Sequence, residues 1–269
     1  MGFLLDGRNV DYVEAGAGPS LVLVPGSFSN TAAWRPITDL LKDRFHVVPT
    51  SLLGCGGTDE RRSADDTSID HEAEMVEAVI ARAGGAVHLI GHSFGGAVVL
   101  AVALRGRARL KSLTLFDGNA CDLLRQNGDR DLYAAVRAMS AAYIAAYHAG
   151  EPDAARRVID FWTGDGSFDG LPPKVRAYAV KTTPANILDW PAMYGFNRPI
   201  ADYAAFDLPV LVVRGANSHA ATRRVAEILA RILPRARLVD VANASHLMIG
   251  THPREIAALI AEHVAAAET

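Results

Sequence analysis

The chain has 269 residues, of which 50% are hydrophobic and 21% are charged. This is enough apolar sequence to bury a large core, and it excludes a disordered chain, a collagen-like repeat and a disulfide scaffold. Lys and Arg together number 27 and Asp and Glu number 30, so the net charge is −3. The chain has no basic excess or basic stripe, which argues against a nucleic-acid partner.

The cysteines and the first residues bear on compartment and cofactors. Cys55 and Cys121 form no CxxC pair and have no metal-ligating residues at useful spacing, so we expect no metal. Two cysteines fit a reducing compartment, and the first ten residues lack the pattern of a signal peptide. We therefore expect a cytoplasmic protein.

One uncharged stretch, Ala83–Leu104, is about long enough to cross a bilayer. It is interrupted by the glycine-rich segment Gly91–Gly96 and begins like a strand. We interpret it as a strand, a turn and a buried helix, and we expect no membrane partner.

In chain order, the first predicted element is a hairpin, because Phe3–Leu5 and Val10–Val13 flank the turn-forming sequence Asp-Gly-Arg-Asn. The short apolar run Ser20–Val24 ends at Pro-Gly and predicts a buried strand. Helices and strands then alternate: helix Thr31–Lys42, strand Phe45–Val48, helix Ile69–Ala83, strand Val87–Ile90, helix Phe94–Leu104 and strand Leu110–Phe116.

The pattern changes between residues 119 and 205, where helices follow one another without strands. The predicted helices there are Leu132–Ala149, Pro152–Trp162, Pro172–Lys181 and Ala185–Tyr194. The alternation then returns with strand Val210–Val213, helix Ala220–Leu233, strand Arg237–Val241 and helix Arg254–Ala266.

Strands that alternate with helices predict an α/β fold, a mostly parallel sheet of eight strands with helices on both faces. In such sheets ligands bind at the carboxyl ends of the strands. A helical segment inserted after Phe116 would lie over that site. We therefore predict a core made of residues 1–118 and 206–269 and a helical cap made of residues 119–205.

The sharpest chemical signal is the segment Gly91-His92-Ser93-Phe94-Gly95, which matches G-x-S-x-G between a predicted strand and a predicted helix. A strand that turns at once into a helix holds the serine in a strained conformation with its hydroxyl exposed. The backbone N–H of Phe94 then lies at the helix N-terminus, where an oxyanion would form. The alternative is a chance match in a chain with 23 glycines, but the strand-and-helix context favours a nucleophile.

With this motif in this context, the chain resembles the capped α/β-hydrolase-fold proteins over essentially its whole length. The resemblance implies a second oxyanion donor in the loop after Ser20–Val24, which reads Pro25-Gly26-Ser27-Phe28. The family usually has His-Gly at the start of this loop, and here Pro replaces the His. The donor maps to the backbone N–H of Ser27, which survives this change.

The resemblance also implies a histidine base after the last strand, and His246 matches that position. Imidazole suits the task because its pKa lies near neutrality, so it can take and return a proton. Ser93 would attack a carbonyl, which excludes the alkyl-ester chemistry of family members with Asp at that position. This chemistry implies no cofactor.

The acid is the point at which the sequence departs from the usual pattern. Many family members place it three residues past a glycine after the strand that here is Val210–Val213; that position is Ser218, and no Asp or Glu lies between Gly215 and Arg224. Others place it before the cap, where this chain has Asp117. Alternatives are that Asp117 only forms an Asp-Gly turn and that Asp240 is the acid.

Large side chains are frequent in the predicted cap, and an apolar cap over a serine favours a small or medium apolar substrate. The candidate pocket residues are Phe28, Trp162, Trp190 and Tyr194, although such residues more often form a cap's own core. We expect a serine hydrolase that cleaves an ester, a lactone or a related acyl substrate through an acyl-enzyme. One alternative is a lyase or perhydrolase. The other is a small-molecule-binding protein, which is favoured by Ser218 at the position where many family members have the acid. The sequence leaves the oligomeric state open.

Overall fold

The computed structural model describes all residues from Met1 to Thr269. Its centre is a parallel sheet of six strands in the order β4-β3-β5-β6-β7-β8. The strands are β3 (Ser20–Val24), β4 (His46–Pro49), β5 (Ala86–His92), β6 (Arg109–Phe116), β7 (Val210–Gly215) and β8 (Ala236–Val241). Each of them overlaps a strand predicted from the sequence.

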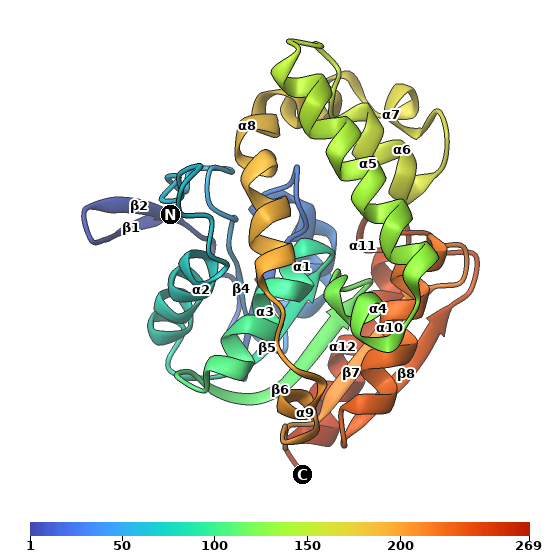
Figure 1. Cartoon of the computed structure of the whole chain (residues 1–269). Coiled ribbons are helices and arrows are strands. Elements are labelled where there is room, and N and C mark those ends of the chain that lie inside the picture. The colour runs from blue at the N-terminus through green and yellow to red at the C-terminus, as the bar shows by residue number, and fades with distance from the viewer.

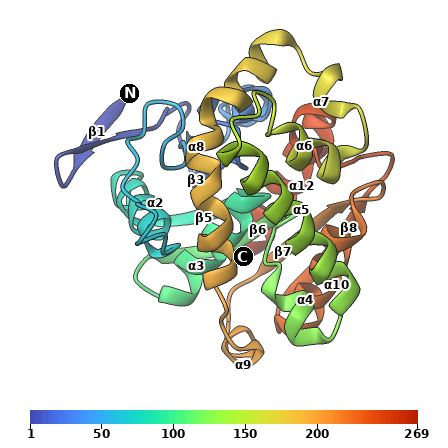
Figure 2. The ribbon, with the colours of Figure 1, turned by 45° about the horizontal axis from the view of Figure 1, so that its top comes forward.

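The first hairpin forms a sheet of its own, which corrects the predicted eight-stranded sheet. Strands β1 (Gly2–Leu5) and β2 (Arg8–Asp11) pair antiparallel around Asp6 and Gly7, which both have positive φ. After β2 the chain makes only isolated bridges beside β4, at Tyr12 and Ala15. Eight strands therefore exist, but six of them form the parallel sheet, and the hairpin lies to one side (Figure 2).

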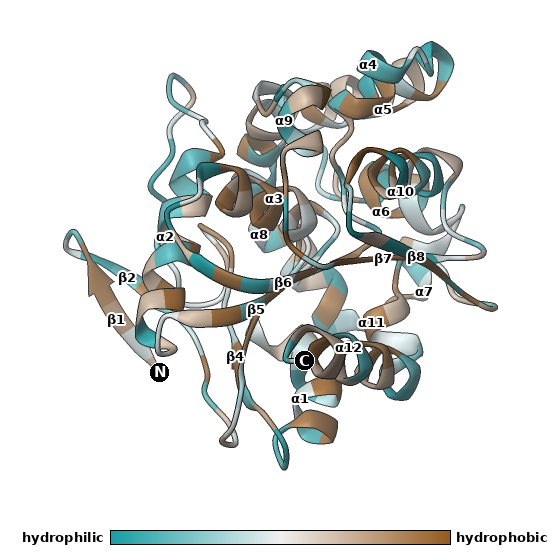
Figure 3. Ribbon diagram, turned by 90° about the horizontal axis from the view of Figure 1, so that it is seen from below, coloured by the Kyte–Doolittle hydropathy of each residue, from teal (hydrophilic) through white to brown (hydrophobic).

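Side chains of alternate residues in each strand enter two separate cores. In β3, Val22 and Val24 belong to one core, whereas Leu21 and Leu23 belong to the other. The first core is covered by α2 (Asp70–Arg82), α3 (Phe94–Arg105) and α10 (Ala220–Ile232). The second is covered by η1 (Thr31–Trp34), α1 (Arg35–Leu41), α11 (Met248–Thr251) and α12 (Pro253–Ala267). Figure 3 shows α1 and α12 on the opposite side of the sheet from α2, α3 and α10.

The chain between β6 and β7 contains helices and no strand, as the sequence predicts. It contains α4 (Asp122–Asn127), α5 (Arg130–His148), α6 (Arg156–Thr163), α7 (Ser167–Gly170), α8 (Pro173–Gly195) and α9 (Ile200–Ala204). Helices α5 to α8 gather above the sheet (Figure 1). We refer to α4–α9 as the helical insertion. No helix of the protein has both the length and the apolar character needed to cross a membrane.

Helix α8 corrects the prediction of two separate helices, Pro172–Lys181 and Ala185–Tyr194. It runs unbroken through Pro184 and Pro191, although a proline removes one hydrogen bond of the helical ladder. Just before Pro184 the hydroxyls of Thr182 and Thr183 donate to the carbonyls of Tyr178 and Ala179 at 2.9 and 3.0 Å. One side of α8 is buried, which favours the continuous helix. Helix α8 passes over the sheet near the end of β5 (Figure 2).

Candidate active site

Ser93 lies in the sharp turn between β5, which ends at His92, and α3, which begins at Phe94. Its backbone has φ 55° and ψ −124°, a strained conformation for a residue with a side chain. A Cβ on Gly91 would lie 2.5 Å from the carbonyl oxygen of Gly95, and a Cβ on Gly95 would lie 2.3 Å from that of Pro25. Only glycine therefore allows the backbone segments to pass so closely, as the sequence motif predicts.

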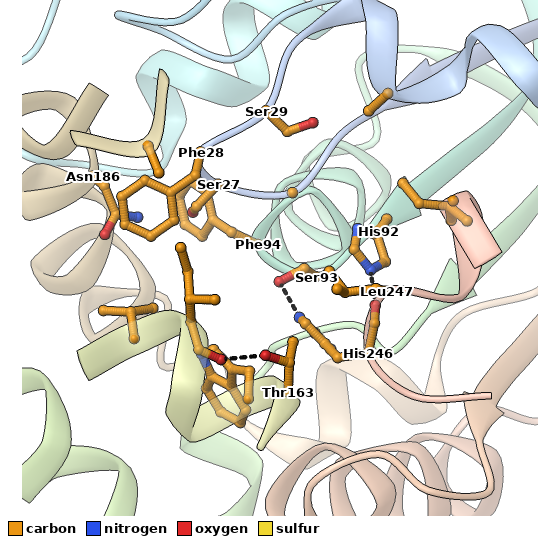
Figure 4. A pocket seen from close by; sticks show the side chains of 18 of the residues that line it. Ser27, Phe28, Ser29, His92, Ser93, Phe94, Thr163, Asn186, His246 and Leu247 are labelled. Carbon is orange, nitrogen blue, oxygen red and sulfur yellow. Dashed lines mark hydrogen bonds between the residues drawn. The ribbon is translucent and has the colours of Figure 1, made fainter. Parts of the chain in front are cut away.

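Hydrogen bonds join His246 to both Ser93 and Asp117, which lie 153 and 129 positions before it in the sequence. The Nδ1 of His246 lies 3.1 Å from Oδ2 of Asp117. A carboxylate can only accept, so Nδ1 carries the proton and Nε2 is left to accept. The Oγ of Ser93 lies 2.9 Å from that Nε2 (Figure 4). The three side chains therefore have the geometry of a nucleophile, a base and a carboxylate that orients the base.

Asp117 directly follows β6 and is fully buried. Its backbone has φ 43°, so the turn that its Asp-Gly sequence predicts is present, and its carboxylate still faces His246. Ser218 donates to its Oδ2 at 2.5 Å and the backbone N–H of Gly215 donates to its Oδ1 at 3.3 Å. The other sequence candidate, Asp240, pairs instead with Arg214 at 2.7 Å.

The backbone and ring of His246 are held by two aromatic neighbours. The Nε2–H of His92 donates to the carbonyl oxygen of His246 at 2.8 Å (Figure 4). Burial lowers the pKa of His92 to about 4, and a charge on His246 adds to the effect, so His92 is neutral at pH 7. Trp162 of α6 stacks on the His246 ring with 5.7 Å between ring centroids. Trp162 was predicted as a pocket residue, but its contact with His246 was not predicted.

The two residues proposed as oxyanion donors both lie close to Ser93. Phe94 is the first residue of α3, so its backbone N–H has no acceptor within the helix. The backbone N–H of Ser27 donates to no protein acceptor. A Cβ on Gly26 would lie only 2.9 Å from the Cβ of Ser93, which brings this loop against the serine. Figure 4 shows Ser27 and Phe94 on the same side of the pocket.

A cavity of about 620 Å³ opens above Ser93. Three of the four pocket residues proposed from sequence line it: Phe28, Trp162 and Trp190. The fourth, Tyr194, lies outside it; its hydroxyl bonds to Ser140 at 2.7 Å and its ring lines a second cavity. The remaining apolar walls come mainly from the helical insertion and α11, and include Val158, Ile159, Leu171, Val175, Met193, Leu247 and Ile249.

Among the polar pocket residues that were not predicted from the sequence are Asn119, Asn186 and Asp189. The Nδ2 of Asn119 donates to Oγ of Ser93 at 3.1 Å, while its buried Oδ1 has no partner. Asn186 and Asp189 come from α8 and are bonded to each other at 2.9 Å. Asn119 could have been predicted from the sequence, because it follows Asp117-Gly118 at the end of a predicted strand. No sequence feature distinguishes Asn186 and Asp189 from the other residues of α8. No group of three or more His, Cys, Asp or Glu side chains is arranged to hold a metal ion.

The alpha/beta hydrolase family model matches residues 21–259. The chain belongs to this family. It is 24% identical over 252 residues to the pimeloyl-[acyl-carrier protein] methyl ester esterase of Nitrosomonas europaea, covering 89% of this chain and 93% of that protein. It is 25% identical over 251 residues to the 2-(acetamidomethylene)succinate hydrolase of Mesorhizobium japonicum, covering 89% and 86%.

Solved structures agree with this family assignment. The thermophilic esterase of Thermogutta terrifontis matches with a TM-score of 0.78 at 22% identity, covering 100% of this chain and 97% of that one. A likeness at this identity shows the shared α/β-hydrolase fold. The sequence resemblance to this family is thus confirmed, and the chain is a hydrolase.

Proposed function

We propose that this hydrolase cleaves a carboxylic ester, or a related lactone or acyl bond, through an acyl-enzyme on Ser93. The observation that carries the proposal is the row Asp117–His246–Ser93, with distances of 3.1 and 2.9 Å, below an apolar cavity. Imidazole, a strained serine and a buried carboxylate in this order are the groups that acyl transfer requires.

In the proposed mechanism, Oγ of Ser93 attacks the substrate carbonyl while Nε2 of His246 takes the hydroxyl proton. Asp117 accepts from Nδ1 of His246 and stabilises the imidazolium that forms. The backbone N–H groups of Ser27 and Phe94 donate hydrogen bonds to the carbonyl oxygen of the substrate. This oxygen carries more negative charge in the transition state than in the bound substrate, so the transition state is stabilised more. His246 then protonates the leaving alcohol, and a water activated by the same nitrogen releases the acid and frees Ser93.

The helical insertion, with the rest of the segment 119–205, would serve as the cap of this site over a core made of residues 1–118 and 206–269. Support comes from the pocket walls, because Trp162, Trp190 and Met193 all belong to the insertion. No Lys or Arg lines the cavity, and Asp189 is its one acidic residue. A carboxylate on the substrate would therefore be buried without a cationic partner, which is costly. We infer a substrate with no negative charge and a small or medium apolar group.

The direct test is hydrolysis of p-nitrophenyl butyrate by the wild type and by Ser93→Ala, together with covalent labelling by a fluorophosphonate. We expect turnover and labelling in the wild type and loss of both in Ser93→Ala. Turnover that survives Ser93→Ala would rule out Ser93 as the nucleophile. If the wild type neither cleaves esters nor reacts with the probe, the proposal is wrong, and lyase, perhydrolase or binding functions would have to be tested instead.

A further inference from the structure

The side chain of Ser27 bonds to a helix of the insertion rather than to the core. Its Oγ donates to Oδ2 of Asp189 on α8 at 2.7 Å, across 162 residues of sequence. The same oxygen of Asp189 accepts from Nδ2 of Asn186 at 2.9 Å. The loop that carries the proposed oxyanion donor is thus bonded through Ser27 to α8.

Asp189 is itself held firmly. Its Oδ1 accepts from Nη1 of Arg62 at 2.7 Å. The Arg62 side chain is fully buried and also pairs with Glu60 at 2.9 Å and Glu72 at 3.5 Å. A buried, multiply paired guanidinium leaves little freedom to the carboxylate that it contacts. Asp189 is therefore a rigid acceptor in front of Ser27.

The loop Pro25–Phe28, which we call the oxyanion loop, needs such support. Phe28 has φ 59°, a region that a bulky residue occupies only when its surroundings hold it there. Its ring packs edge-on against Tyr143 of α5, with 6.4 Å between centroids. The side chains of Ser27 and Phe28 thus both contact the helical insertion. Figure 4 shows these two residues near Asn186 of α8.

We propose that Asp189 is a positioning residue that holds Ser27 so that its backbone N–H faces the developing oxyanion. The inference rests on the proposed function. It gives the insertion a role beyond covering the pocket, because a shift of α8 would move the oxyanion donor. A misplaced donor weakens binding of the transition state more than binding of the substrate, so the effect should fall on kcat rather than on KM.

The main experiment compares Ser27→Ala with Ser140→Ala. Ser27→Ala keeps the backbone donor and removes only the hydroxyl that bonds to Asp189. Ser140→Ala also removes a hydroxyl bonded to α8, at Tyr194, but this hydroxyl makes no hydrogen bond to the oxyanion loop. We expect Ser27→Ala to lower kcat for p-nitrophenyl butyrate and the rate of fluorophosphonate labelling about tenfold, with KM changed less than twofold. Ser140→Ala should change neither rate.

A double variant tests whether Asp189 acts through Ser27. Asp189→Asn leaves Arg62 paired with Glu60 and Glu72, so the fold is kept, and denaturant unfolding checks this. If the residues act as one unit, Ser27→Ala combined with Asp189→Asn should lower kcat no further than the more damaging single variant.

Three results would overturn the inference. Unchanged kcat and labelling rate in folded Ser27→Ala would mean that the bond does not position the donor. An equal loss in Ser140→Ala would mean that any weakened contact with α8 has this effect. Multiplying losses in the double variant would mean that Asp189 acts independently of Ser27. A wild type that the probe does not label would instead overturn the proposed function, and this inference with it.

Discussion

The hydroxyl of Ser218 donates to Oδ2 of Asp117 at 2.5 Å, and the same oxygen lies 3.1 Å from Nδ1 of His246. Ser218 is the residue at which the family resemblance would have placed the acid. The carboxylate that contacts His246 comes instead from the end of β6, and the serine after β7 donates a hydrogen bond to it. Because β6 and β7 are neighbours in the sheet, a carboxylate at either strand end can reach the same imidazole.

Asp117→Asn should lower kcat by about three to four orders of magnitude, because the amide favours the wrong tautomer of His246. Ser218→Ala should lower kcat only about threefold to tenfold, since one hydrogen bond to the carboxylate is lost and the N–H of Gly215 remains. Steady-state kinetics with p-nitrophenyl butyrate measures both. Equal activity of Asp117→Asn and the wild type would show that another residue is the acid.

The nearness of the two strand ends predicts that the acid can be moved. Adding Ser218→Asp to Asp117→Asn should raise kcat at least about tenfold over Asp117→Asn alone. The new carboxyl carbon would take the place of Oγ of Ser218, which now contacts Oδ2 of Asp117. Asn at position 117 tolerates the positive φ found there. Ser218→Asp alone is the control and should lower kcat, since two carboxylates would then compete for one site. A double variant no better than Asp117→Asn would contradict this geometry.

His92 should make stability depend on pH below neutrality. Burial lowers the pKa of folded His92 from 6.5 to about 4, so between these values the unfolded chain binds the extra proton. The free energy of unfolding that His92 contributes is therefore fully present above pH 6.5 and falls as the pH drops toward 4.

Urea unfolding of the wild type and His92→Gln at pH 4.5, 5.5 and 7 measures this dependence. Gln keeps a donor for the carbonyl of His246 but does not titrate. Between pH 7 and 4.5, the free energy of unfolding of the wild type should fall by on the order of 2–3 kcal/mol more than that of the variant. Parallel pH profiles for the two proteins would show that His92 does not titrate differently in the folded and unfolded states.

The close approach at the serine turn predicts a large cost for one methyl group. A Cβ on Gly95 would lie 2.3 Å from the carbonyl oxygen of Pro25, and two backbone segments would have to separate. Gly95→Ala should therefore destabilise the fold by about 1–3 kcal/mol and reduce labelling of Ser93. Gly170→Ala, on α7 with no atom within 4 Å of its Cβ, is the matched control and should be neutral or slightly stabilising. Similar unfolding midpoints for both variants would argue against a tightly packed turn.

The charge of the pocket predicts selectivity between matched esters. Methyl hexanoate and monomethyl adipate differ only in a terminal methyl or carboxylate, and no Lys or Arg lines the cavity to pair with the latter. We expect kcat/KM to favour methyl hexanoate by about tenfold or more, since an unpaired carboxylate would have to leave water. Methanol release under pH-stat control measures both. Preference for the adipate ester would contradict a substrate without negative charge.

Local patterns were sufficient to predict Ser93 and most of the secondary structure. The strand, glycine-flanked turn and helix around Ser93 depend on residues within a few positions of each other, and their backbone geometry follows from glycine and apolar periodicity. The six parallel strands alternate with helices in the same way. Asp117 and His246 could be proposed because the family resemblance places an acid and a base after the strands that here end at Phe116 and Val241. Parallel strands end at one edge of the sheet, so the two positions were expected to be close.

The contacts between distant residues were decided by the tertiary structure alone. The bonds of Ser218 to Asp117 and of Ser27 to Asp189 join residues 101 and 162 positions apart, and no local pattern specifies such pairs. Helix α8 continues through Pro184, against the local preference of proline, because burial of its inner side outweighs the lost hydrogen bond of the helix. Local preferences are worth about 1 kcal/mol per residue, so they select the elements of this fold, whereas packing and buried hydrogen bonds select which side chains meet.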